Sequence, residues 1–241
     1  MKLIVVKDYN EMSLKASLII KELLVAKKDA TLGLATGSSP IGIYQNLIKF
    51  YENKEISFKD VKTYNLDEYC ELPRSHPESY YSFMHRNLFS HVDVLEENVH
   101  IPCSEGSDLQ ALCKEYNDQL HQAEIDIQLL GIGANGHIGF NEPNTPFTQE
   151  TWVVELTEKT RLDNQRFFNS LDEVPTHAMT MGIKNIMDAK CLLLVASGKN
   201  KAEAIRRLAS GEVSEECPAT ILNNHPNAIV IVDEEAASLI K

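Results

Sequence analysis

The chain has 241 residues, of which 43% are hydrophobic and 24% charged, and its formal net charge is −12. This composition is ordinary for a folded globular protein, and the acidic balance excludes non-specific nucleic-acid binding, which requires a basic face. No apolar run approaches the ~20 residues that a membrane-spanning helix needs, and the N-terminus shows no signal-peptide pattern. We therefore expect a cytoplasmic protein that binds neither nucleic acid nor membrane.

Strand and helix patterns alternate along the whole chain. The predicted strands are Leu3–Val6, Thr31–Ala35, Val61–Leu66, Ile125–Leu130, Trp152–Leu156, Cys191–Ala196 and Ala228–Val232. The predicted helices are a stripe over Met12–Leu23, one opening at Pro40, and the segments Glu78–Phe89, Leu109–Ala123 and Lys201–Leu208. This alternation predicts an open, mostly parallel α/β sheet with helices on both faces, as one domain over residues 1–241. Ligands of such sheets bind beyond the carboxyl ends of the strands.

The residues Thr36-Gly37-Ser38-Ser39-Pro40 follow the second predicted strand. Ser39 is a good N-cap, and Pro40 suits the first position of a helix. Free backbone N–H groups, small hydroxyls and the positive end of a helix together make an anion site. Taken alone, these residues are better explained by a plain capped turn, and no Lys-Ser/Thr follows as in a Walker A loop.

A glycine-rich stretch, Gly131 to Gly136, matches G-x-G-x-x-G directly after a strand. A dinucleotide site would also need a helix to begin there, but the chain continues with Gly139, Pro143 and Pro146. We therefore do not predict a nicotinamide cofactor. The glycines instead indicate a tight loop whose backbone can approach a ligand.

The same loop carries the polar side chains Asn135, His137, Asn141 and Glu142 within eight residues. A histidine beside a carboxylate can move protons near neutral pH, because the acid fixes its tautomer and raises its basicity. A lone loop histidine would more simply be a hydrogen-bonding residue. Here the neighbouring polar groups favour catalysis.

Two adjacent acids, Asp67 and Glu68, follow the third predicted strand between Tyr64 and Tyr69. Acids at that position can simply end a strand or cap a helix. Two acids flanked by tyrosines at the same sheet edge equally suit a general base in a sheltered cleft. The spacing alone leaves both interpretations open.

Metal-binding patterns are absent from the sequence. The five cysteines contain no C-x-x-C pair, and the eight histidines contain no H-E-x-x-H pair or zinc-deaminase signature. We expect reduced, partly buried thiols and neither metal nor cofactor.

Two cations are candidates for binding an anionic ligand. Arg166 follows a polar stretch, and Lys201 opens a predicted helix, where its charge opposes the helix dipole unless an anion is bound. The other basic residues of these regions are expected to be ordinary surface charges; they are Arg161, Lys199, Arg206 and Arg207.

Several of these motifs together resemble the glucosamine-6-phosphate deaminase family. The matching stretches are Ala35–Pro40, Asn65–Tyr69, His76–Met84, Gly131–Pro143, Thr160-Arg161, Arg166–Phe168, Val174-Pro175 and Thr180–Gly182. The most specific combination is Gly-His-Ile-Gly-Phe-Asn-Glu-Pro at 136–143 with Leu-Asp-Glu-Tyr at 66–69. The resemblance extends from about residue 30 to residue 232. It implies a Rossmann-like three-layer α/β/α sandwich, shared with ribose-5-phosphate isomerase and phosphogluconolactonase.

The resemblance implies that glucosamine 6-phosphate and water become fructose 6-phosphate and ammonia in amino-sugar catabolism, without metal or cofactor. The 6-phosphate would be held by residues of three segments, namely Thr36, Gly37, Ser38, Ser39, Arg166 and Lys201. His137, oriented by Glu142 and Asn135, would open the pyranose ring. Asp67 would move the C2 proton of the open-chain sugar to C1.

Two features distinguish this chain within the resemblance. Many members have Asp where Asn135 stands, but an asparagine can still orient His137, so ring opening should persist with a shifted pH profile. The family's mobile lid should correspond to residues 152–180 and bring Arg166 over the phosphate. The partner is thus a small sugar phosphate, and the sequence favours neither a monomer nor a homo-oligomer.

Two other functions fit the same architecture. A phosphogluconolactonase shares the Gly-His pair but lacks the Phe-Asn-Glu-Pro continuation at 140–143. A non-catalytic sugar-phosphate sensor would carry a helix-turn-helix before the domain, whereas this chain opens with the strand at Leu3.

Overall fold

The computed structural model describes residues 1–102, 105–106, 108–158, 161–162, 165 and 168–240. Its centre is a sheet whose seven strands are all parallel. In spatial order the strands are β1 (Lys2–Val6), β10 (Ala228–Asp233), β9 (Leu192–Ala196), β6 (Ile127–Leu130), β2 (Thr31–Leu34), β3 (Lys62–Asn65) and β5 (Val99–His100). Continuous burial of β2, β6 and β9 fits strands that are covered on both faces.

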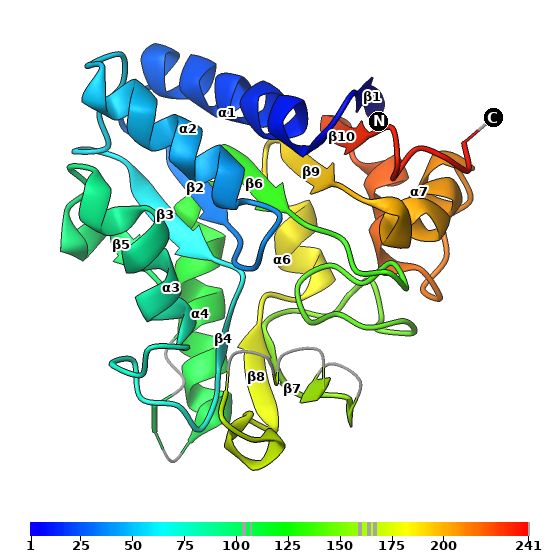
Figure 1. The fold of residues 1–241 in the computed structure, drawn as a ribbon. Helices are drawn as coiled ribbons and strands as arrows, with labels where there is room; N and C mark the ends of the chain where they lie inside the picture. Colours follow the sequence, from blue (N-terminus) through cyan, green and yellow to red (C-terminus); the bar gives the residue numbers. More distant parts are fainter. Residues whose placement is uncertain (103–104, 107, 159–160, 163–164, 166–167, 241) are drawn as a thin grey trace.

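Helices cover both faces of this sheet (Figure 1). One core packs under α1 (Tyr9–Ala26), α2 (Ile41–Glu52) and α3 (Tyr80–Asn87). The other packs under α4 (Leu109–Ala123), α6 (Ile183–Met187) and α7 (Ala202–Ala209). Short 3₁₀ turns complete the fold at Phe89–His91, Glu96–Asn98, Leu171–Glu173, Lys199–Lys201 and Pro218–Asn224. The predicted three-layer α/β/α sandwich is confirmed.

A second, three-stranded sheet lies beside the large one and is antiparallel. Its order is β4 (Asp67–Tyr69), β8 (His177–Thr180) and β7 (Trp152–Glu155). Only β7 was predicted from the sequence. A single residue, Leu66, separates β3 from β4, so the chain passes directly from the large sheet into the small one.

Several predicted boundaries differ from those observed. Helix α2 begins at Ile41, and Pro40 occupies its N-cap without a side-chain capping bond, so the predicted cap at Ser39 is wrong. The predicted helix at 78–89 begins later, because the Ser79 side chain accepts a hydrogen bond from the N–H of Ser82 and caps α3. Helix α7 likewise begins one residue after Lys201.

The large sheet has a switch point between β2 and β6. From β2 the chain continues to β3 on one side, whereas the strand that follows β6 within this sheet, β9, lies on the other side. The loops after β2 and β6 therefore diverge and leave a crevice at the carboxyl edge, where ligands of such sheets bind.

No helix in the described ranges combines the length and apolar content needed to cross a membrane. Four cysteines are free and buried, as expected, namely Cys70, Cys113, Cys191 and Cys217. Cys103 lies outside the described residues.

Candidate active site

A cavity of about 420 Å³ opens at the switch point. Nine of the predicted site residues line it, namely Thr36, Gly37, Ser38, Ser39, Asp67, Asn135, His137, Glu142 and Lys201. The tenth, Arg166, lies outside the described residues. Segments far apart in the sequence thus meet at one place, as the end-of-strand positions predict.

The loop after β2 is fixed by two tyrosine hydroxyls. Tyr9 on α1 donates to the carbonyl of Ser38 at 2.9 Å and accepts the N–H of Gly42 at 2.9 Å. Tyr44 on α2 donates to the carbonyl of Ala35 at 2.5 Å. Gly37 has φ +85°, a conformation that favours glycine. The loop is therefore held open toward the cavity, with small hydroxyls and backbone N–H groups at its surface.

Lys201 reaches the same cavity from the turn after β9. A buried acid, Asp233, holds that turn: it accepts the Ser197 hydroxyl at 2.5 Å and the N–H of Gly198 at 3.1 Å. The N–H of Lys201 bonds back to the carbonyl of Gly198 at 3.0 Å. Sequence reasoning did not identify Asp233, which is the last residue of β10.

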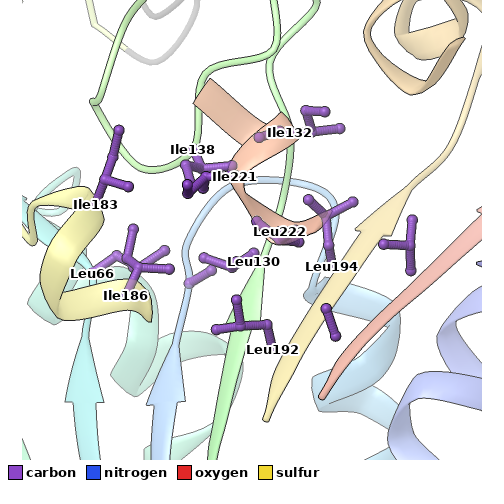
Figure 2. Close-up of a cluster of buried hydrophobic side chains, with 14 of the residues drawn as sticks. Leu66, Leu130, Ile132, Ile138, Ile183, Ile186, Leu192, Leu194, Ile221 and Leu222 are labelled. Carbon is purple, nitrogen blue, oxygen red and sulfur yellow. The ribbon is translucent and has the colours of Figure 1, made fainter. Parts of the chain in front are cut away.

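The loop after β6 is anchored in the core below the cavity. Ile132 and Ile138 are 5% and 0% exposed and pack with Leu194 and Leu222 of the large core (Figure 2). Glycine is required at position 133, because an added Cβ would lie 2.3 Å from Cε1 of the His137 ring. Gly133 therefore makes room for the imidazole itself.

His137 lies between two polar partners. Its Nδ1 is 3.4 Å from Oε1 of Glu142, an ion-pair distance without hydrogen-bond geometry. Its backbone N–H donates to Oδ1 of Asn135 at 3.2 Å, and Nδ2 of Asn135 donates to Oε2 of Glu142 at 2.7 Å. The acid and the amide thus form one group with the backbone of His137, and the acid lies at ion-pair distance from its imidazole. Asn141 instead is fully buried, and its Nδ2 donates to backbone carbonyls, so its role is structural.

The loop is also held from outside by the segment at 215–219. Gly136 has φ +89°, and an added Cβ would lie 2.2 Å from Sγ of Cys217. The N–H of Ala219 donates to the carbonyl of Gly136 at 2.9 Å, and that of Asn144 donates to the carbonyl of Glu215 at 2.7 Å. Sequence patterns do not indicate this support, because the paired positions, such as Gly136 and Ala219 or Asn144 and Glu215, lie far apart in the chain.

Asp67 begins β4 and is 7% exposed at the cavity wall. Burial raises the pKa of its carboxyl to about 8, and the neighbouring Glu68 adds to the rise. A carboxylate with such a pKa is a competent proton acceptor near neutral pH. The structure therefore favours the general-base interpretation of Asp67 over that of a strand terminator.

Aromatic side chains close one side of the cavity. Tyr80 and Phe140 line it, with their rings stacked at 6.3 Å between centroids, and Tyr69 packs 4.6 Å from Tyr80. Thr157 and Asn200 also contribute to the wall. Sequence reasoning did not identify Tyr80 as a site residue, although it lies in the stretch His76–Met84 that carries part of the resemblance.

Arg161 is not the ordinary surface charge that the sequence predicted. It is half-buried, and its Nη2 donates to the carbonyls of Leu171 at 2.9 Å and Val174 at 3.1 Å. It thus fixes the turn at 171–174. Arg206 and Arg207 pair with Glu203 and Glu216 at the surface.

Around the cavity and elsewhere in the described ranges, there is no group of three or more His, Cys, Asp or Glu side chains suited to a metal ion. The cavity is lined by the polar loop 36–39 and Lys201, and by two groups able to transfer protons, Asp67 and His137. These features define a Rossmann-like α/β/α protein whose crevice is equipped for acid–base chemistry on an anionic ligand.

Comparison with known proteins agrees with this class. Residues 9–231 match the family described as glucosamine-6-phosphate isomerases/6-phosphogluconolactonase. Glucosamine-6-phosphate deaminases of Clostridium botulinum (strain Alaska E43 / Type E3) and Thermoanaerobacter pseudethanolicus are 52% and 51% identical over 241 residues, covering all of this chain and 97% and 95% of theirs. A solved structure of a monomeric glucosamine-6-phosphate deaminase has 45% identity and a TM-score of 0.96, covering 99% of this chain and 100% of that one. The chain belongs to the glucosamine-6-phosphate isomerase/6-phosphogluconolactonase family.

Proposed function

We propose that the protein converts glucosamine 6-phosphate and water to fructose 6-phosphate and ammonia, in the catabolism of amino sugars. The observation that carries this proposal is the cavity shared by Asp67, the His137–Glu142 pair and the loop 36–39. An aldose–ketose isomerisation needs a base for the C2 proton, and ring opening needs a second proton-transfer group. The identity of about 50% to the two deaminases over the full chain supports the same substrate.

The phosphate binds at the loop 36–39 and Lys201. The loop offers hydroxyls and N–H groups, and the lysine offers the positive charge that a phosphate needs in a protein of net charge −12. Arg166 completes this subsite. Binding energy from the phosphate, which does not react, orients the sugar over the two proton-transfer groups.

His137 opens the pyranose ring. Its imidazole takes the proton of the C1 hydroxyl and delivers a proton to the ring oxygen, so that the C1–O5 bond breaks and an aldehyde forms. Glu142 and Asn135 hold the ring and stabilise its protonated form.

Asp67 then carries the isomerisation. Its carboxylate removes the C2 proton to give an enolamine, and the same proton is returned to C1, giving a ketimine at C2. Water adds to C2 of the ketimine, and the C–N bond breaks to release ammonia and leave the ketone of fructose 6-phosphate. The sequence of steps is an isomerisation followed by hydrolytic deamination, and no oxidant or reductant is consumed.

The segment 152–180 acts as a lid over the bound sugar. Its ends are the paired strands β7 and β8, and the part between them is the part proposed to cover the sugar. Thr157 at the start of that part lines the cavity. A sugar phosphate should therefore protect this segment from a protease, and equal cleavage with and without ligand would contradict the lid.

The decisive experiment measures ammonia and fructose 6-phosphate formed from glucosamine 6-phosphate in excess EDTA, with Asp67→Asn alongside. We expect equal amounts of the two products and loss of about 10²–10⁴-fold of the rate in the variant. If the parent protein binds the sugar phosphate but releases no ammonia, the protein is a sugar-phosphate sensor and not an enzyme. Hydrolysis of 6-phosphogluconolactone instead would indicate a lactonase.

A further inference from the structure

Glu68 is a second buried carboxylate, directly after Asp67, and it does not line the cavity. Neighbouring side chains of a strand point to opposite sides, so Glu68 points away from the site when Asp67 points into it. It is 1% exposed. A buried acid beside a catalytic acid requires a physical explanation.

The Glu68 carboxylate is held by three backbone N–H groups. Its Oε1 accepts from Tyr69 at 2.8 Å and from Tyr80 at 2.8 Å, and its Oε2 accepts from Tyr81 at 2.9 Å. Tyr80 and Tyr81 are the first two residues of α3, so the carboxylate lies at the positive end of that helix. All three contacts use the carboxylate as an acceptor, which is the pattern of an ionised group. Burial raises the pKa of Glu68, while these N–H groups and Arg74 oppose the rise.

Arg74 is the charged group beside Glu68, and the acids Glu71 and Glu78 lie near Cys70 and Tyr69. The remaining groups around the two acids are neutral or line the cavity. Asp67 faces tyrosines from four elements, all with a pKa raised by burial; they are Tyr44, Tyr69, Tyr80 and Tyr116. Beside Glu68 lies the Cys70 thiol, whose pKa is raised to about 12. His137, Glu142 and Lys201 share the cavity with Asp67. Within this part of the described structure, Glu68 is the fixed negative charge next to Asp67 on its own strand.

We propose that Glu68 is a positioning residue for the proton transfer: anchored on the N-terminus of α3, it places a buried negative charge directly after Asp67 on the same strand, and its bond to the backbone N–H of Tyr80 holds that residue at the cavity wall. This inference rests on the proposed role of Asp67. A like charge nearby disfavours the carboxylate form of Asp67 and so raises its affinity for the C2 proton. A base matched to the working pH transfers a proton more effectively than one with the pKa of a free carboxyl.

The test compares Glu68→Gln with Glu68→Asp in the pH profile of kcat/KM. Glutamine keeps the Oε1 acceptor for Tyr69 and Tyr80 but removes the charge, so the acid limb should move to lower pH by roughly one unit and kcat should fall. Aspartate keeps the charge but is shorter, so the acid limb should remain near that of the parent while the melting temperature falls. An acid limb in Glu68→Gln that coincides with that of the parent overturns the inference.

Glu71→Gln is the matched control. Glu71 is the next acid along the chain, but its side chain is 48% exposed, so water screens its charge. Its removal should leave the acid limb unchanged. A shift as large as that of Glu68→Gln would mean that any local loss of negative charge acts equally, and would remove the specific role of Glu68.

A second readout does not depend on turnover. The ¹³C carboxyl resonance of Asp67, assigned by its disappearance in Asp67→Asn, should titrate at lower pH in Glu68→Gln than in the parent. If this midpoint moves but no ammonia is formed, the proposed function fails while the link between the two acids stands. If the midpoint does not move in an active enzyme, the link fails and the function stands.

Discussion

The side-chain amide of Asn135 links Glu142 to the backbone of His137: Nδ2 donates to Oε2 of the acid at 2.7 Å, and Oδ1 accepts the histidine N–H at 3.2 Å. A neutral amide can donate on one side and accept on the other. An aspartate at this position keeps only the acceptor. The link therefore depends on an amide at position 135.

Asn135→Asp should change the pH dependence of catalysis. The new carboxylate would face Glu142 without a donor between them, and like charges raise the pKa of such a pair. Ionisation of Glu142, which stabilises protonated His137, should therefore require a higher pH, so the acid limb of kcat/KM, to which Asp67 also contributes, should move to higher pH. Asn144→Asp, at an exposed position with φ +71°, controls for the added charge. A profile of Asn135→Asp that matches the parent would contradict this reasoning.

Asp67→Asn should make the protein more stable at high pH while it removes activity. The pKa of Asp67 is about 8 in the folded chain against 3.8 for the free group. The folded state therefore binds more protons than the unfolded state between these values, and stability falls as pH rises through that window. Asparagine removes this loss of folding stability, which is on the order of 1–3 kcal/mol at pH 8. The melting temperature should rise by about 2–4 °C for each kcal/mol. Thermal unfolding at pH 8 and pH 4 measures it, and an equal difference at both values would refute it.

Gly136→Ala should lower both stability and kcat. The new methyl group would lie 2.2 Å from Sγ of Cys217 at a φ of +89°, so the loop that carries Asn135 and His137 must shift. Such strain and overpacking cost about 1–3 kcal/mol each. Gly211→Ala is the control, because Gly211 has φ +81° with no atom within 4 Å of the added Cβ. It should lose only about 1–2 kcal/mol and keep its kcat; equal kcat in the two variants would show that the Cys217 contact does not position the loop.

Lys201→Ala should raise KM for the sugar phosphate with a smaller effect on kcat. Loss of a charged contact to a phosphate costs about 1.5–3 kcal/mol, which corresponds to roughly 10–100-fold in affinity. Lys199→Ala, two residues earlier and exposed outside the cavity, should leave KM unchanged. Steady-state kinetics of both variants decide the matter, and an unchanged KM in Lys201→Ala would remove the lysine from the phosphate subsite.

Most of the large sheet could be predicted from the sequence because its strands are short, continuous apolar runs that alternate with helical periodicity. Helix α4 has the predicted bounds, since Asp108 caps it and its apolar positions repeat with helical spacing. Strands β4 and β8 were not predicted, because Asp-Glu-Tyr and His-Ala-Met-Thr show no strand pattern and form only by pairing with each other. Local sequence cannot indicate a strand that exists only through its partner.

The candidate site, too, could be predicted from the sequence only in part. Its lining residues could be located because the ends of parallel strands meet at one sheet edge. The supporting contacts could not, since Cys217, Asp233 and Arg161 act through side chains that the fold brings in from distant segments. Asp67 and Glu68 are neighbouring carboxylates and look alike in the sequence. Their different environments arise only from the tertiary structure that buries them.

The residues of the site come from two different sheets, because the chain passes from the large sheet into the small one at Leu66. The loop 36–39 and the loop that carries His137 extend from the large sheet, whereas Asp67 belongs to the small one, where it pairs with Thr180. The Thr180 hydroxyl in turn accepts the N–H of Phe140 at 3.2 Å, from the loop that carries His137. In the proposed mechanism, the Leu66 and Thr180 junctions therefore set the distance between the loop 36–39, which binds the phosphate, and the base Asp67. Relatives that act on longer or shorter carbon chains could arise by changing this joint while every group that touches the substrate stays the same.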